Sequence, residues 1–110
     1  MKVDMETLAK STGISNIELL KGFVNDFFTI CSKDLARIPQ VIEKGDNEAL
    51  IRHSHNIYGA AYRLRLEDIK QAAASLVRAA NNMETEKYDK LYDELAEVFT
   101  TSSIEYKETA

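Results

Sequence analysis

Cysteine, proline and glycine are scarce in this chain of 110 residues, and each shortage excludes a class of protein. There is one cysteine, one proline and four glycines. Because Cys31 has no second cysteine to pair with, an internal disulfide is excluded, and a reducing compartment fits the sequence. Few helix breakers, together with many Ala, Leu, Glu and Lys residues, favour a helical protein.

The chain also has no long apolar run and no run of basic residues. Its apolar stretches are only a few residues long, far short of the roughly 20 residues that span a bilayer. The N-terminus lacks a basic segment followed by an apolar one, so we predict no secretory signal and expect a cytoplasmic protein without a membrane segment. A net charge of −4 without a basic stripe argues against nucleic acid as a partner.

Apolar residues instead repeat at spacings of three and four, the period of helices that pack through one face. A short helix is predicted from Val3 to Lys10, capped by Asp4 and ended near Gly13. A long helix should then start at the capping box formed by Ser15 and Glu18. Its predicted buried face comprises Leu20, Val24, Phe27, Cys31, Leu35, Ile38 and Ile42, widened by Phe23 and Ile30.

Three further helices are predicted downstream. Gly45 ends the long helix and Asp46 caps the next one. The following helix is expected from Leu66 to Asn82, and Thr85 caps the last one. The residues expected to be buried in the last helix are Tyr88, Leu91, Leu95, Val98 and Ser102. Residues 100–110 are mostly polar, and we expect them to fray.

These elements predict an all-α fold, an antiparallel up-down-up-down four-helix bundle with a short N-terminal helix capping one end. Short connections between long helices favour antiparallel neighbours. Residues 1–110 are assigned to a single domain, with its core at about residues 3–100. We expect this domain to be a monomer.

One histidine is expected to point away from the core of its helix. The residues predicted to face the core are Leu50, Ser54, Ile57, Ala61 and Leu64. His55 points nearly the opposite way, on an outer face that also carries Glu48, Ile51, Arg52, Tyr58, Gly59 and Tyr62. A glycine inside a helix costs about 1 kcal/mol relative to alanine. Gly59 therefore suggests that another molecule must approach the imidazole closely.

The stretch from Ser54 to Arg65 resembles the motif of the histidine-phosphotransfer (HPt) domains of bacterial and fungal phosphorelays. That motif is a small residue, the phosphorylated His, two residues, Lys, Gly, two small residues and then Leu-Gly. The matching residues are His55, Gly59, Ala60, Ala61 and Leu64. Tyr58 stands where the family has Lys, and Arg65 stands where it has the later Gly. The resemblance spans roughly residues 3–100.

The resemblance implies a phosphorelay phosphocarrier and not an enzyme with activity of its own. His55 would accept a phosphoryl group on its outer ring nitrogen from the aspartate of one response-regulator receiver domain and pass it to another. The implied partners are receiver domains and a hybrid sensor histidine kinase. No cofactor or metal is expected on this chain, because the catalytic aspartate and the Mg²⁺ belong to the receiver.

Two side chains are candidates for stabilising the phosphoryl group. Tyr58 has no charge but can donate a hydrogen bond, and Arg52, one turn before His55, can pair with phosphate oxygens. The family's glutamine on the following helix, which bonds the imidazole, falls here at Val77, with Arg78 beside it. Interface centres favour aromatic groups over charges. The residues expected to dock the receiver are Ile51, Tyr58, Gly59 and Tyr62.

Other interpretations stay open. The chain could be an HPt-like binding module that docks receivers but has reduced phosphotransfer, and His55 and Arg52 could be ordinary surface residues. His53 points about 160° away from His55 on a helix, so the two cannot bind one metal. We expect His53 to be buried and hydrogen-bonded. No metal-ligand spacing and no nucleophile turn occurs in the sequence.

Overall fold

Residues 4–109, the part of the chain that the computed structural model describes, form five α-helices. Their bounds are α1 Met5–Thr12, α2 Ile17–Lys44, α3 Asn47–Arg63, α4 Glu67–Asn81 and α5 Tyr88–Thr109, and a 3-10 turn, η1, spans Thr85–Lys87. No strand occurs in residues 4–109, which confirms the all-α class. Val3 and Ala110, which fall in predicted ranges, lie outside the described residues.

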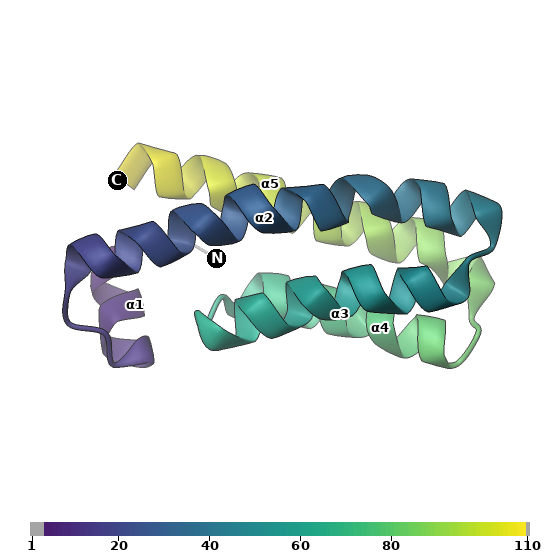
Figure 1. The fold of residues 1–110 in the computed structure, drawn as a ribbon, viewed down its shortest axis with the longest axis horizontal. Coiled ribbons are helices and arrows are strands. Elements are labelled where there is room, and N and C mark those ends of the chain that lie inside the picture. The colour runs from purple at the N-terminus through teal and green to yellow at the C-terminus, as the bar shows by residue number, and fades with distance from the viewer. Residues whose placement is uncertain (1–3, 110) are drawn as a thin grey trace.

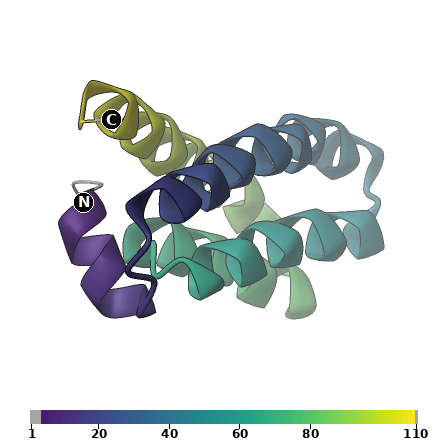
Figure 2. The same cartoon turned by 60° about the vertical axis from the view of Figure 1, so that its left-hand side comes forward.

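Each long helix packs against the next one along the chain. α3 lies against both α2 and α4, and α5 lies against both α4 and α2. Figure 1 shows these four helices extending along the long axis of the molecule, and Figure 2 shows α1 at the end where α2 begins. α1 packs against α2 and buries Leu8 in the core. Among the described residues, no helix is long and apolar enough to cross a membrane.

Most helix ends lie where the sequence predicts them. The Asp4 carboxylate accepts a backbone N–H in the first turn of α1, and Gly13 ends that helix with φ of 77°. Gly45 ends α2 with φ of 70°, a left-handed conformation that favours glycine. Asp46 then caps α3 by accepting the backbone N–H of Ala49 at 3.1 Å. The two aspartates and the two glycines therefore begin and end these helices as predicted.

Two predicted caps were wrong. The cap of α2 is Asn16, not Ser15, and its side-chain oxygen accepts the backbone N–H of Leu19 at 3.1 Å. Asn and Ser are equally good N-caps, so the sequence alone does not decide which of the two adjacent residues caps the helix. Thr85 starts the 3-10 turn and forms no side-chain cap, and α5 begins after it at Tyr88.

The buried face of α2 is narrower than the sequence predicts. The residues of the main stripe are buried or half-buried, as expected. Phe23 and Ile30, however, are 43% and 60% exposed, so the prediction that they widen the buried face was wrong. Because α3 and α5 cover only part of the circumference of α2, side chains at the edge of its apolar stripe stay in contact with water.

Residues 100–109, in the polar stretch that the sequence predicts to fray, belong to the last helix, α5. α5 continues to Thr109, and Ser102 and Tyr106 are buried. The hydroxyl of Tyr106 donates a hydrogen bond to the carbonyl oxygen of Lys21 at 3.2 Å, and its ring packs against Phe28. The first turns of α2 extend beyond the end of α3, and the last turns of α5 lie along that extension (Figure 1). The polar composition of the tail gave no sign of this contact.

Two turns between helices use left-handed residues that are not glycine. Arg65, between α3 and α4, has φ of 59°, and Met83, after α4, has φ of 55°. The backbone N–H of Arg65 bonds to the carbonyl oxygen of Tyr62 at 3.2 Å, which closes the turn. Arg65 therefore adopts a conformation that glycine would adopt more easily, at a cost of about 1 kcal/mol.

Candidate functional site

His55 lies on the exposed face of α3, on the side opposite the core, as predicted. Ser54, Ile57 and Ala61 on the inner face are completely buried. Ser54 donates its hydroxyl to the carbonyl oxygen of Leu50 at 2.6 Å, so this buried polar group is satisfied within the helix. The inner face thus fixes the rotation of α3, and this rotation points His55 toward solvent.

A hollow of about 250 Å³ lies beside His55, between α3 and α4. His55 and Tyr58 form its α3 wall. The opposite wall comes from α4 and the residue after it, through Ala74, Val77, Arg78, Asn81 and Asn82. The imidazole therefore has a cavity on one side, large enough for a small charged group.

Three aromatic rings follow each other along the edge of α3. The ring centroid of Tyr58 lies 6.0 Å from that of His55 and 6.2 Å from that of Tyr62. Tyr62 is 47% exposed. Ile51 and Tyr58 are less exposed, because they pack partly against the core. The four residues predicted to dock a partner, Ile51, Tyr58, Gly59 and Tyr62, therefore share one side of α3 but differ in how much surface they offer.

Two cations lie over the outermost of these rings. The guanidinium of Arg65 is 5.4 Å from the centroid of Tyr62, and the ammonium of Lys70 is 5.6 Å from it. Lys70 also pairs with Glu67 at 2.8 Å, and this hydrogen bond raises the pKa of Lys70. These contacts place Tyr62 between a polar turn and α4, where cation–π attraction orders its ring.

No internal contact requires the glycine at position 59. A Cβ atom added at Gly59 would meet no heavy atom within 4 Å. The helix therefore accepts the weaker helix former although its own packing leaves room for alanine. The open space above position 59 would let another molecule approach closely.

Arg52 and Arg78 lie in different places with respect to His55. Arg78 lines the hollow that His55 and Tyr58 also line. Arg52 lines a separate hollow between α2 and α3, together with His53. Glu84 pairs with Lys87 at 2.9 Å, and this pairing is the main reason that the pKa of Glu84 is lowered; Arg78 contributes least. Arg78 is thus the cation that the fold brings to the candidate site.

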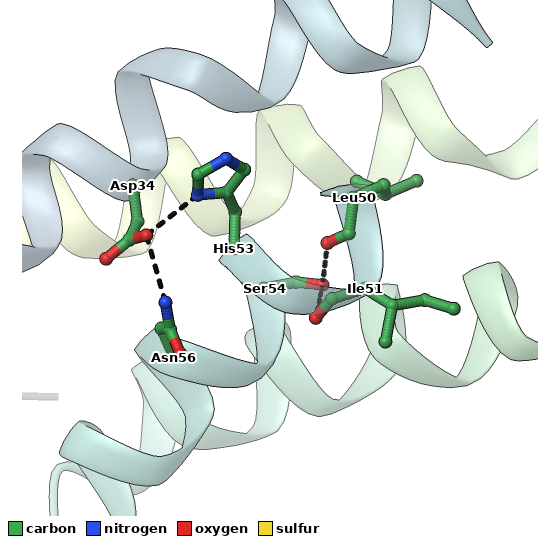
Figure 3. A network of polar contacts seen from close by, with 6 residues as sticks. All are labelled: Asp34, Leu50, Ile51, His53, Ser54 and Asn56. Carbon is green, nitrogen blue, oxygen red and sulfur yellow. Dashed lines mark hydrogen bonds and ion pairs between the residues drawn. The ribbon is translucent and has the colours of Figure 1, made fainter. Parts of the chain in front are cut away.

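The prediction of a buried, hydrogen-bonded His53 is confirmed. His53 is 8% exposed, and its Nδ1 lies 2.8 Å from Oδ1 of Asp34 on α2 (Figure 3). The side-chain amide of Asn56 donates to the same oxygen at 3.3 Å. His53 therefore links α3 to α2 and takes no part in the His55 hollow.

The described residues offer no site for a metal and no activated thiol. Within residues 4–109, no group of three or more His, Cys, Asp or Glu side chains is placed to hold a metal ion. Burial, together with the charge of Asp34, raises the pKa of the Cys31 thiol to about 11. Cys31 is therefore protonated near neutral pH and inert as a nucleophile.

The chemistry available at the site is that of one exposed imidazole. A neutral imidazole nitrogen can attack phosphorus, and the neighbouring hollow can take the oxygens of the bound group. The guanidinium of Arg78 and the hydroxyl of Tyr58 are suited to bind such oxygens.

In the comparisons with known proteins, no family model matches this chain, and no curated protein or solved structure is similar to it at a significant level.

Proposed function

We propose that this protein is a phosphorelay phosphocarrier of the HPt type. It accepts a phosphoryl group on His55 from the aspartyl phosphate of one receiver domain and passes the group to another receiver. The observation that carries this proposal is the exposed His55, one turn from a glycine with open space above it and beside a hollow that contains an arginine.

The transfer needs little from this chain beyond the imidazole. A ring nitrogen of His55 attacks phosphorus, the bond between phosphorus and the aspartate oxygen breaks, and the carboxylate leaves on the partner. In the return step, the N–P bond breaks as the carboxylate of the second receiver attacks. The partner supplies the metal ion and the aspartate, so the phosphocarrier has no catalytic activity alone.

The phosphoryl oxygens carry negative charge and need donors close to His55. Arg78 and Tyr58 share the hollow with His55 and are the donors that the geometry favours. Arg52 remains a second candidate, one turn before His55 on α3. An arginine from the neighbouring helix would thus take the role that a lysine on the same helix has in the HPt family.

The docking surface for the receiver comprises Ile51, Tyr58, Gly59 and Tyr62. Gly59 permits close approach, and the tyrosines supply rigid, partly apolar contact area with few rotatable bonds. The proposed partners are receiver domains and a hybrid sensor histidine kinase. The proposal places the protein in the cytoplasm as a monomer.

The packing of the helices agrees with an HPt-type bundle. Each long helix contacts the next one along the chain, and α5 also contacts α2, as in an antiparallel up-down-up-down four-helix bundle. α1 sits at the end where α2 begins and would serve as the cap (Figure 2).

A second candidate is a binding module that docks receivers without carrying phosphate. Tyr58 favours it, because a neutral side chain stands where the family has a lysine. In that case, the aromatic edge of α3 would bind the partner, and His55 would contribute only surface.

Transfer from phosphorylated receiver domains separates the two candidates. We expect acid-labile, base-stable label on the wild-type protein and on the variant His53→Gln, and none on His55→Gln. Circular dichroism of each variant verifies the fold. Receiver binding without label on the wild-type protein would favour the binding module and contradict the phosphocarrier.

A further inference from the structure

A second, larger hollow of about 560 Å³ lies between α2 and α3. Its rim contains Lys33, Arg37 and Gln40 from α2 and Arg52 from α3, and His53 and Asp46 also line it. None of its lining residues belongs to the hollow at His55. Apart from Arg52, the second candidate for binding the phosphoryl oxygens, the proposed phosphotransfer uses none of these residues.

Three cations of this hollow have no carboxylate partner. Among the described residues, no carboxylate oxygen lies within 4.0 Å of the charged nitrogens of Lys33, Arg37 or Arg52. All three side chains are exposed, and Lys33 and Arg37 lie one turn apart on α2. Like charges at this spacing destabilise a helix. Their concentration in one hollow of a protein with net charge −4 therefore suggests an anionic ligand.

Two carboxylates at the hollow, Asp46 on its rim and Asp34 bonded to the lining residue His53, already accept hydrogen bonds. Oδ1 of Asp34 accepts hydrogen bonds from His53 at 2.8 Å and Asn56 at 3.3 Å. The carboxylate of Asp46, on the rim, accepts the backbone N–H of Ala49 and caps α3. With three cations and one carboxylate on the rim, the hollow stays positive.

The walls of the hollow are held at a fixed separation. Oδ1 of Asp34 on α2 accepts hydrogen bonds from His53 and Asn56 on α3 (Figure 3), so side chains join the two helices at His53, which lines the hollow. A preformed site loses less conformational entropy when it binds a ligand. This network therefore holds together the two helices that carry Arg37 and Arg52.

We propose that the hollow between α2 and α3 binds a phosphate-type oxyanion. Arg37 and Arg52 bind its oxygens from opposite walls, because the planar guanidinium matches the geometry of phosphate. Lys33 adds a point charge, and the amide of Gln40 can donate a further hydrogen bond. Free phosphate, pyrophosphate and the phosphates of a nucleotide all have this chemistry.

The test is a titration of the ¹⁵N-labelled protein with pyrophosphate, followed by NMR and matched in ionic strength with sodium chloride. We expect saturable shifts of the amides around Lys33, Arg37 and Arg52. Arg37→Gln and Arg52→Gln should each weaken binding about tenfold. Arg63→Gln is the matched control, because it removes one exposed arginine of α3 that lines a different hollow. Its affinity should equal that of the wild-type protein.

Two additional ligands identify the chemistry. Equal binding of ATP and pyrophosphate would assign the phosphate group alone as the ligand, and tighter binding of ATP would assign a nucleotide. Equal binding of malonate would overturn the preference for phosphate. Shifts that do not saturate, or equal weakening by Arg63→Gln and Arg37→Gln, would overturn the site. His55→Gln should leave the affinity unchanged, so the outcome is independent of the proposed phosphotransfer.

Discussion

The rings of His55 and Tyr58 lie with their centroids 6.0 Å apart on the exposed edge of α3, and both line the same hollow. A tyrosine at this position can donate one hydrogen bond but cannot neutralise the charge of a phosphoryl group. Because its neighbour on α4 is Arg78, the hollow still contains a cation. Position 58 and position 78 together determine how stable a phosphorylated His55 would be.

Replacing Tyr58 by lysine should lengthen the lifetime of the phosphorylated protein. The ammonium would add a charge next to the phosphoryl oxygens, and a charged hydrogen bond is worth about 1.5–3 kcal/mol. We expect the half-life of phosphohistidine to rise at least severalfold, measured as loss of label after the receiver is removed. Tyr58→Phe, which loses only the hydroxyl, should shorten it modestly. Identical half-lives for both variants would mean that this side chain does not touch the phosphoryl group.

Gly59 and Gly22 form a matched pair for testing access to His55. Both lie inside helices, and a Cβ atom added at either would meet no heavy atom within 4 Å. Gly59→Ala and Gly22→Ala should each raise the free energy of unfolding by about 0.5–1 kcal/mol, measured in urea, because alanine is the better helix former.

Only Gly59→Ala should slow phosphotransfer from a receiver. Gly22 lies on α2, away from the hollow of His55, so its variant serves as the control for a change in stability. If both variants transfer at the wild-type rate, Gly59 does not mark the docking site.

Arg78 should matter more than Arg52 for the phosphorylated state. Arg78 shares the hollow of His55, whereas Arg52 lines the hollow between α2 and α3. Arg78→Gln should therefore shorten the half-life of phosphohistidine severalfold, and Arg52→Gln should change it less. If Arg52→Gln shortened the half-life more than Arg78→Gln, the stabilising charge would be that of Arg52 on α3.

The stability of the fold should fall at alkaline pH, in part because of Cys31. Burial raises the pKa of this thiol from 9.0 to about 11, so the folded state holds the proton more tightly than the unfolded state. The resulting stabilisation is complete below about pH 9 and is lost as the pH rises through about 11, for a total on the order of 2 kcal/mol.

A comparison of pH profiles isolates this thiol from the tyrosines. Burial also raises the pKa values of Tyr88, Tyr92 and Tyr106, so the ionisation of these tyrosines destabilises the fold over a similar pH range. Cys31→Ala should lower stability at every pH but lose less of it between about pH 9 and about pH 11 than the wild-type protein does. Parallel profiles would contradict the raised pKa.

Local signals in the sequence predicted the helix ends and the direction of His55. Asp4, Gly13, Gly45 and Asp46 act on the backbone within a few residues, so their effect does not depend on the rest of the fold. The rotation of α3 follows from the spacing of its own apolar residues. Both kinds of information are contained in one segment of the chain.

The remaining features depend on how the helices pack. The exposure of Phe23 depends on how much of α2 its neighbours cover, and the burial of Tyr106 depends on the length of α2 beyond α3. The position of Arg78 beside His55 depends on the register between α3 and α4. No local pattern contains these quantities. The one sign of the role of Arg78 was its position directly after Val77, where the resemblance places the residue that bonds the imidazole.

The most direct measurement is phosphorylation of the protein by phosphoramidate, a small donor that needs no partner and releases ammonia as its P–N bond breaks. The modified residue is then located by ³¹P NMR and mass spectrometry of the wild-type, His55→Gln and His53→Gln proteins. The proposed function predicts phosphohistidine at His55 in the wild-type protein and in His53→Gln, and none in His55→Gln. An unmodified His55, or the same label in all three proteins, would contradict it.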